Sequence, residues 1–220
     1  MSTPAIVVAH RAGNDPATMA AAAVHADVVE ADVHLFRGRL EVRHAKTLGP
    51  IPVLWERWYL LDRGTPRISL EAVLEAAAPD VGLMLDLKGI DPRLPGRVLR
   101  AAEARLAETG LFVSSRAWRL VDRLHGAPGV RTLHSVGNRR ELRALLRRYP
   151  SGALEGVSVH RRLLEPAVVS ALRVRAPQVW SWPVDDLATA RALADWGVTG
   201  FISDAPHLLQ PVRASDRSQF

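Results

Sequence analysis

The chain has 220 residues, of which 48% are hydrophobic and 24% charged, as in soluble globular proteins with one well-buried domain. It contains no cysteine, which excludes disulfide bonds, thiolate metal sites and a cysteine nucleophile. The formal net charge is +6, and the densest group of arginines lies at 139–148. The spacing of these arginines is that of one solvated helix face, so we expect no nucleic-acid partner.

The N-terminal segment has neither a basic region nor an apolar run of signal-peptide length. No stretch approaches the roughly 18 consecutive apolar residues of a transmembrane helix. We therefore expect a cytoplasmic protein without a transmembrane segment. No feature of the sequence predicts its oligomeric state.

The first part of the chain predicts two buried strands with a helix between them. The apolar run 5–9 is typical of a buried strand, and Asp15 followed by Pro16 predicts the start of a helix. The second strand is expected at 28–33. An alternating segment with a glycine turn follows at 35–44 and predicts a hairpin that returns His44 to the end of this strand.

The segment 45–67 is rich in proline and glycine and shows little periodicity. It predicts a long loop over the face of the domain. Loops of this length are uncommon in compact domains unless they are functional or mobile.

The rest of the chain alternates apolar runs with amphipathic patterns. Further strands are expected at 82–89, 111–115, 131–136, 156–160, 178–184 and 198–203. Helices are expected at 69–76, 94–108, 118–124, 139–149, from 165 onward and at 186–196. Eight strands separated by helices predict an α/β fold, a single (β/α)8 TIM barrel over residues 1–210. We expect a polar C-terminal tail at 211–220.

Polar side chains are concentrated where these strands end. In a TIM barrel the functional groups gather at the carboxyl ends of the strands. The candidates at these ends, with His44 from the hairpin, are His10, Arg11, Glu30, Asp32, His44, Asp86, Lys88, His160 and Trp182.

Two of the candidate acids share a strand. Glu30 and Asp32 are separated by one residue, so their side chains point to the same side of an apolar strand. Burying two carboxylates requires a positive charge between them. With Asp86 they offer an oxygen ligand set that suits one divalent cation, Mg²⁺ or Ca²⁺.

The remaining candidates fit phosphodiester chemistry. Arg11 and Lys88 suit an anionic, phosphate-bearing ligand. Two histidines across the metal can take and return a proton. His160 is either a substrate contact or a structural cap, and Trp182 is either a wall for the leaving alcohol or part of the barrel filling.

The motifs, in this order, resemble the glycerophosphodiester phosphodiesterases over nearly the whole chain. The resemblance is carried by His10-Arg11-Ala12-Gly13, Glu30-Ala31-Asp32-Val33, His44, Leu85-Asp86-Leu87-Lys88, Trp180-Ser181-Trp182-Pro183-Val184-Asp185 and the stretch 197–206.

The resemblance implies a metal site and a pair of catalytic histidines in a (β/α)8 barrel. It implies that Glu30, Asp32 and Asp86 bind one divalent metal. It also implies that His10 and His44 act as general acid and base, and that Arg11 and Lys88 hold the phosphate. In the mechanism proposed for the family, a substrate hydroxyl attacks phosphorus and water then opens a cyclic phosphate. The expected partner is a small-molecule phosphodiester.

Three positions depart from the family pattern. The family has Pro-Glu-Asn-Thr after its His-Arg-Gly motif, whereas this chain has Asn-Asp-Pro-Ala-Thr at 14–18 and lacks the glutamate. The second histidine is usually followed by aspartate, but Ala45 follows His44. The third acid is usually glutamate, but here it is Asp86, as in related phospholipase-D toxins.

These departures leave two other functions open besides the cleavage of glycerophosphodiesters to an alcohol and glycerol 3-phosphate. One is a lysophospholipid or sphingolipid phosphodiesterase of the same barrel, which forms a cyclic phosphate. The other is a barrel that binds a phosphate ligand without catalysis.

Overall fold

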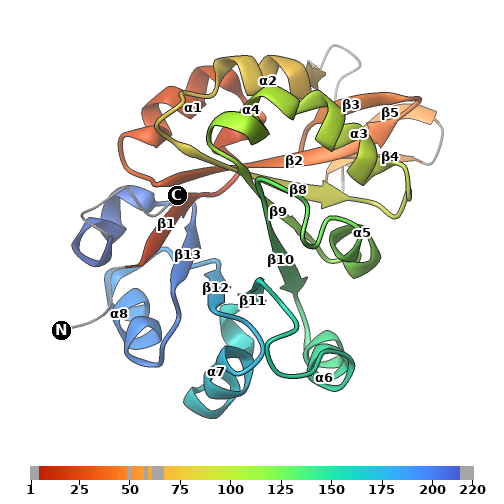
Figure 1. Cartoon of the computed structure of the whole chain (residues 1–220). Helices are drawn as coiled ribbons and strands as arrows, with labels where there is room; N and C mark the ends of the chain where they lie inside the picture. The colour runs from red at the N-terminus through yellow and green to blue at the C-terminus, as the bar shows by residue number, and fades with distance from the viewer. Residues whose placement is uncertain (1–4, 49–50, 57–58, 61–66, 214–220) are drawn as a thin grey trace.

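Eight parallel strands form a closed ring at the centre of the protein (Figure 1). The computed structural model describes residues 5–48, 51–56, 59–60 and 67–213. The ring consists of β1 (Ile6–Ala9), β2 (Val28–Phe36), β8 (Gly82–Lys88), β9 (Leu111–Ser115), β10 (Val130–Val136), β11 (Gly156–His160), β12 (Gln178–Trp182) and β13 (Gly200–Ser203). It closes because β1 pairs with both β2 and β13. The predicted TIM barrel is confirmed.

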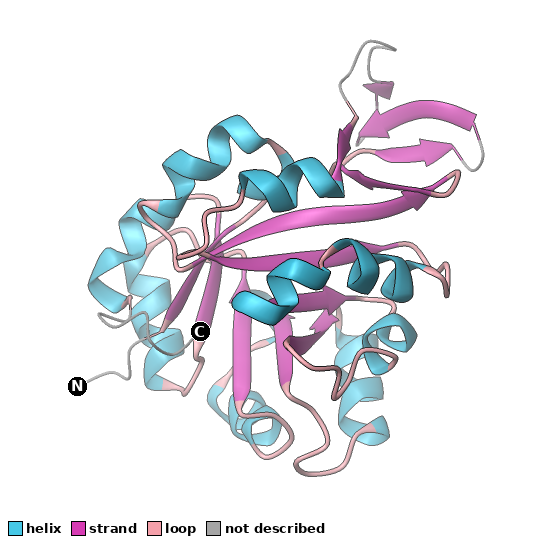
Figure 2. Ribbon diagram, turned by 45° about the horizontal axis from the view of Figure 1, so that its top comes forward, coloured by secondary structure: helices cyan, strands magenta, loops and turns pink. Residues whose placement is uncertain are grey.

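Helices surround the ring on its outer side (Figure 2). They are α1 (Pro16–Ala23), α2 (Leu70–Ala76), α3 (Leu94–Ala101), α4 (Glu103–Glu108), α5 (Trp118–Asp122), α6 (Arg139–Arg148), α7 (Pro166–Arg173) and α8 (Leu187–Asp195), with short 3-10 helices at Ala12–Asn14, Arg161–Leu163 and Pro206–Val212. Asp15 caps α1 by accepting a hydrogen bond from the Ala17 amide, as its position before Pro16 predicts. The helix predicted at 94–108 is two helices. None of the described helices is long and apolar enough to cross a membrane.

An apolar layer fills the ring. It consists of Val8, Val28, Met84, Phe112, Leu133, Trp180 and Ile202. The indole of Trp180 fits because Gly200 lies beside it: a Cβ on Gly200 would lie 2.6 Å from Trp180 Cδ1. Side chains alternate along a strand, so the residue two positions after each member of this layer also points into the barrel. It lies one layer nearer the carboxyl ends of the strands.

The segment after β2 contains strands and is not the long loop that we predicted. The predicted hairpin is present, with β2 antiparallel to β3 (Arg39–Val42). Beyond it lie β4 (Lys46–Leu48), β5 (Ile51–Glu56), β6 (Tyr59–Leu60) and β7 (Ile68–Ser69). Strands β4, β5 and β6 form an antiparallel sheet outside the ring.

The proline within β5 explains why the sequence of this segment resembled a loop. Lys46 pairs with Trp55 and Thr47 with Leu54, and the register then shifts so that Leu48 pairs with Ile51. Pro52 therefore lies in the irregular part of the ladder, where its missing amide hydrogen removes no regular bond. Residues 57–58 and 61–66 of the predicted loop lie outside the described residues.

The start of the predicted C-terminal tail packs on the barrel. The last 3-10 helix ends at Val212, which is buried. Arg213 Nε donates a hydrogen bond to Asp27 Oδ1 at 2.6 Å, and Asp27 Oδ2 accepts another from the Val7 amide at 2.8 Å. Residues 214–220 of the tail lie outside the described residues.

A buried histidine joins the outer face of β10 to two neighbouring helices. His134 Nε2 lies 2.9 Å from Asp122 Oδ1, which also accepts a hydrogen bond from the Tyr149 hydroxyl at 2.8 Å. Arg148 forms a 2.7 Å ion pair with the other Asp122 oxygen. Burial lowers the pKa of His134, and the bond to Asp122 only partly opposes this shift.

We expect this histidine to make stability depend on pH. Below pH 6.5, the usual pKa of histidine, the unfolded chain takes up a proton that folded His134 does not, so the free energy of unfolding falls as pH falls. Between pH 7.5 and 5.5, the free energy of unfolding measured with urea should fall less for His134→Gln than for the wild type. His25→Gln, at an exposed histidine that has no part in the pKa shift of His134, is the matched control. An equal fall in the free energy of unfolding for the wild type and for His134→Gln would contradict this role of His134.

Candidate active site

A cavity of about 810 Å³ opens directly above the apolar layer, at the carboxyl ends of the strands. The side chains two positions beyond the apolar layer line it: His10, Glu30, Asp86, Ser114, Ser135, Trp182 and Asp204. All the site residues that we predicted from the sequence line this cavity except Asp32, which is 1% exposed. The structure therefore brings the predicted candidates together around one space.

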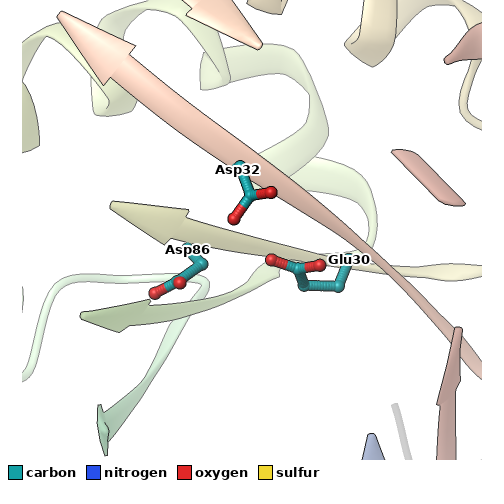
Figure 3. A group of neighbouring side chains, drawn as sticks. All are labelled: Glu30, Asp32 and Asp86. Atoms are coloured by element: carbon teal, nitrogen blue, oxygen red, sulfur yellow. The ribbon is translucent and has the colours of Figure 1, made fainter. Parts of the chain in front are cut away.

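Three carboxylates form the centre of the site. Glu30 and Asp32 come from β2 and Asp86 from β8, and Asp32 and Asp86 are register partners. One carboxylate oxygen from each residue lies within 4.8 Å of the other two. Figure 3 shows the three side chains close together between the neighbouring strands. Glu30 and Asp32 are buried, so water screens their charges little.

The charges in this cluster shift one another's pKa values. Burial, together with the negative charges of Asp32 and Asp86, raises the pKa of Glu30 well above its usual range. Burial also acts to raise the pKa of Asp32, but its bond to His44 and the nearby Lys88 ammonium lower it overall. Lys88 Nζ lies 2.6 Å from Asp32 Oδ1 and also pairs with Asp86.

The cluster fits a divalent cation. It offers oxygen atoms from three carboxylates and no sulfur, the donor set of hard cations such as Mg²⁺ and Ca²⁺. Lys88 supplies one positive charge against these three acids, so the group attracts further positive charge. The negative charges of Asp32 and Asp86 also raise the pKa of Glu30, after burial, which is the largest cause.

The two predicted catalytic histidines are each held by a carboxylate. His10 Nδ1 lies 2.7 Å from Asp204 Oδ1, and His44 Nδ1 lies 3.2 Å from Asp32 Oδ2. A carboxylate only accepts hydrogen bonds, so the hydrogen of each neutral imidazole sits on Nδ1 and Nε2 keeps a lone pair. Both rings line the cavity.

Arg11 takes a left-handed backbone conformation at the edge of the site. Its φ is 56°, which is unfavourable for a residue with a side chain. In this conformation its amide donates a 2.7 Å hydrogen bond to Glu30 Oε2, and its Nε lies 4.0 Å from Asp32 Oδ2. The backbone turn therefore ties the first strand to the acids on β2.

Several residues with a role in this geometry were absent from our predicted set. Asn14 donates from Nδ2 to Asp32 Oδ2 at 2.8 Å and accepts from the Asp32 amide at 2.7 Å. Ser114 Oγ donates to Asp86 Oδ1 at 2.7 Å. The signal for Asp204 was its position directly after the last strand, where the preceding strands carry candidate residues.

A fourth histidine also lines the cavity. His34 lies two residues beyond Asp32 and is the register partner of Lys88. Burial and the positive charge of Arg43 lower the pKa of His34 to about 3. It is therefore neutral at physiological pH.

The side of the cavity away from the three clustered acids carries two aromatic rings and Arg116. His160 and Trp182 lie edge to face, with ring centroids 4.9 Å apart. His160 Nδ1 also accepts a 3.2 Å hydrogen bond from the Arg162 amide, so the residue both caps the following turn and lines the cavity. Trp180 fills the barrel, whereas Trp182 borders the cavity.

Several solved structures of phosphodiesterases are similar to this chain. A phosphodiesterase from Oleispira antarctica in complex with the product sn-glycerol-3-phosphate is 18% identical, with a TM-score of 0.74 over 95% of this chain and 96% of that one. A glycerophosphodiester phosphodiesterase from Parabacteroides distasonis is 21% identical, with a TM-score of 0.73 over 96% of this chain and 98% of that one. The glycerophosphodiester phosphodiesterase from Thermotoga maritima is 18% identical, with a TM-score of 0.74 over 97% of this chain and 100% of that one.

No protein-family model and no curated protein sequence matches the chain. The structural likeness extends over nearly the full length of these proteins. The chain has the fold of the glycerophosphodiester phosphodiesterases.

Proposed function

We propose that the protein is a metal-dependent phosphodiesterase that cleaves glycerophosphodiesters to an alcohol and glycerol 3-phosphate. The observation that carries this proposal is the placement of three clustered carboxylates and two carboxylate-held histidines around one cavity. The fold supports it, because the solved proteins that share the fold are phosphodiesterases, one of them in complex with sn-glycerol-3-phosphate.

Glu30, Asp32 and Asp86 are the residues that would hold Mg²⁺ or Ca²⁺. When bound, such an ion supplies positive charge that stabilises the negative oxygens of the phosphoryl group during reaction. Asn14 and Ser114 orient two of the acids through hydrogen bonds and keep them in ligand geometry.

The two histidines would carry the protons of the reaction. One Nε2 accepts the proton of the attacking hydroxyl as its oxygen bonds to phosphorus. The other histidine, protonated, donates a proton to the oxygen of the departing alcohol as the ester bond breaks. Attack by a neighbouring hydroxyl of the substrate gives a cyclic phosphate, and water then opens this ring with the two histidines in exchanged roles.

Arg11 and Lys88 are the cations that would hold the phosphate. Arg11 offers a planar fork for two phosphate oxygens, and its side chain is 38% exposed at the cavity. Lys88 offers a point charge between the acids and the cavity. Both lie beside Asp32, so a phosphate that contacts them also lies next to the acidic cluster.

We expect wild-type protein to release glycerol 3-phosphate from glycerophosphocholine and EDTA to abolish this activity. His10→Ala should lower kcat by roughly 100-fold or more, because acid–base catalysis typically contributes factors of about 10²–10⁴. Glu30→Gln should also lower kcat strongly, because it removes the charge of one of the three carboxylates that would hold the metal. His207→Ala, at a histidine of the last 3-10 helix, is the matched control and should keep full activity.

The same variants separate metal binding from catalysis. Mg²⁺ or Ca²⁺ should raise the Tm of the wild type and of His10→Ala, but not of Glu30→Gln, because ligands that bind the native state stabilise it. Wild-type protein that shows this shift yet turns over neither glycerophosphodiesters nor lysophospholipids would be a binding protein, and the proposed activity would fall. Turnover of lysophospholipids alone would favour the lipid-directed alternative.

Asp204 should act through His10, because it is the carboxylate that holds His10 Nδ1. Asp204→Asn removes the charge that fixes the imidazole tautomer and should lower kcat about tenfold, less than loss of the histidine itself. The metal-induced rise in Tm should be unchanged. Asp195→Asn, at an exposed carboxylate that ends α8, is the control. An unchanged kcat in Asp204→Asn would contradict the proposal that Asp204 positions His10.

A further inference from the structure

Two serines lie side by side in the half of the cavity away from the three clustered acids, where Arg116 also lines the wall. Ser135 of β10 and Ser158 of β11 are register partners on neighbouring strands. Each lies two residues beyond a position at the level of the apolar layer, so both side chains point into the barrel and line the cavity. Ser135 is 8% exposed and Ser158 is 2% exposed, so both hydroxyl groups lie deep at the cavity wall.

Neither hydroxyl has a hydrogen-bond partner in the part of the chain that the structure describes. Three other buried strand serines are bonded: Ser114 donates to Asp86 at 2.7 Å, Ser115 to the Leu87 carbonyl at 2.6 Å and Ser203 to Asp185 at 3.0 Å. Ser181 is not bonded among the described residues, and it does not line the cavity. Buried polar groups usually find a partner, and an unsatisfied one costs stability. Because Ser135 and Ser158 line the cavity, their hydroxyl groups are available to bond a polar group of a ligand that enters it.

The chemistry of this wall restricts the ligand group that it can hold. The acids belong to β2 and β8, whereas β10 and β11 contribute hydroxyl groups at the same level. Serine hydroxyls both donate and accept, so they match neutral alcohol groups. They are a poor surface for an acyl chain, which would leave both hydroxyls buried without a partner.

We propose that Ser135 and Ser158 bind free hydroxyl groups on the glycerol moiety of the substrate, and thereby select unacylated glycerophosphodiesters over lysophospholipids. The inference rests on the function proposed above, since it places the phosphate at Arg11 and Lys88 across the same cavity. The two serines act on specificity and take no part in proton transfer.

The test compares two phosphates that differ in their hydroxyl groups. Binding of sn-glycerol 3-phosphate and of n-propyl phosphate to the full chain is measured by calorimetry, in Mg²⁺ and separately in Ca²⁺. The wild type should bind glycerol 3-phosphate more tightly. Ser135→Ala and Ser158→Ala should each weaken the binding of glycerol 3-phosphate about three- to tenfold, the usual range for a neutral hydrogen bond. The affinity for n-propyl phosphate should stay unchanged.

Ser181→Ala is the matched control. Ser181 is a fully buried strand serine whose Oγ also has no partner among the described residues, but it lies between two inward-pointing tryptophans and does not line the cavity. It should leave both affinities unchanged. The Tm of each variant reports folding, and the two serine variants test the proposal independently.

The outcomes separate this inference from the function on which it rests. Equal affinity of the wild type for the two phosphates, or unchanged preference in both serine variants, overturns the role of the serines and leaves the phosphate site intact. Failure to bind either phosphate overturns the proposed function and the serine assignment with it. Turnover rates provide a second measurement. The preference for glycerophosphocholine over lysophosphatidylcholine should fall in both serine variants.

Discussion

The burial of Glu30 and Asp32, with the partly buried Asp86 beside them, is the constraint on which this site depends. Such a group is unfavourable unless positive charge and hydrogen bonds compensate it. The surrounding residues do this: Lys88 pairs with two of the acids, Asn14 bonds Asp32, and the Arg11 amide bonds Glu30. Even so, the pKa of Glu30 stays raised, chiefly by burial and then by the charges of Asp32 and Asp86.

The period-two alternation of the strands makes such a cluster possible within a stable barrel. One layer of inward positions is entirely apolar and excludes water from the ring. The next layer is polar and borders the cavity. A shift of one residue in β2 would replace Glu30 and Asp32 by alanine and valine at the cavity, so the register of this strand decides whether the site exists.

Sequence patterns predicted the barrel and the residues at the ends of its strands, because alternation and apolar runs are local signals. They did not predict contacts between distant segments. Asp204 reaches His10 across 194 positions of sequence, and only closure of β13 onto β1 brings them together. The strands at 46–60 were missed because Pro52 resembles a loop signal unless the irregular register of its ladder is known.

Asn14 shows how a departure from a family motif can be compensated locally. The chain lacks the glutamate of the usual Pro-Glu-Asn-Thr, yet Asn14 both donates to the Asp32 carboxylate and accepts from the Asp32 amide. A neutral amide adds no negative charge to a cluster that already has an excess of it. The departure therefore keeps Asp32 oriented, and the shorter Asp86 is likewise held, by Ser114. Both changes are consistent with a site that still binds a divalent cation.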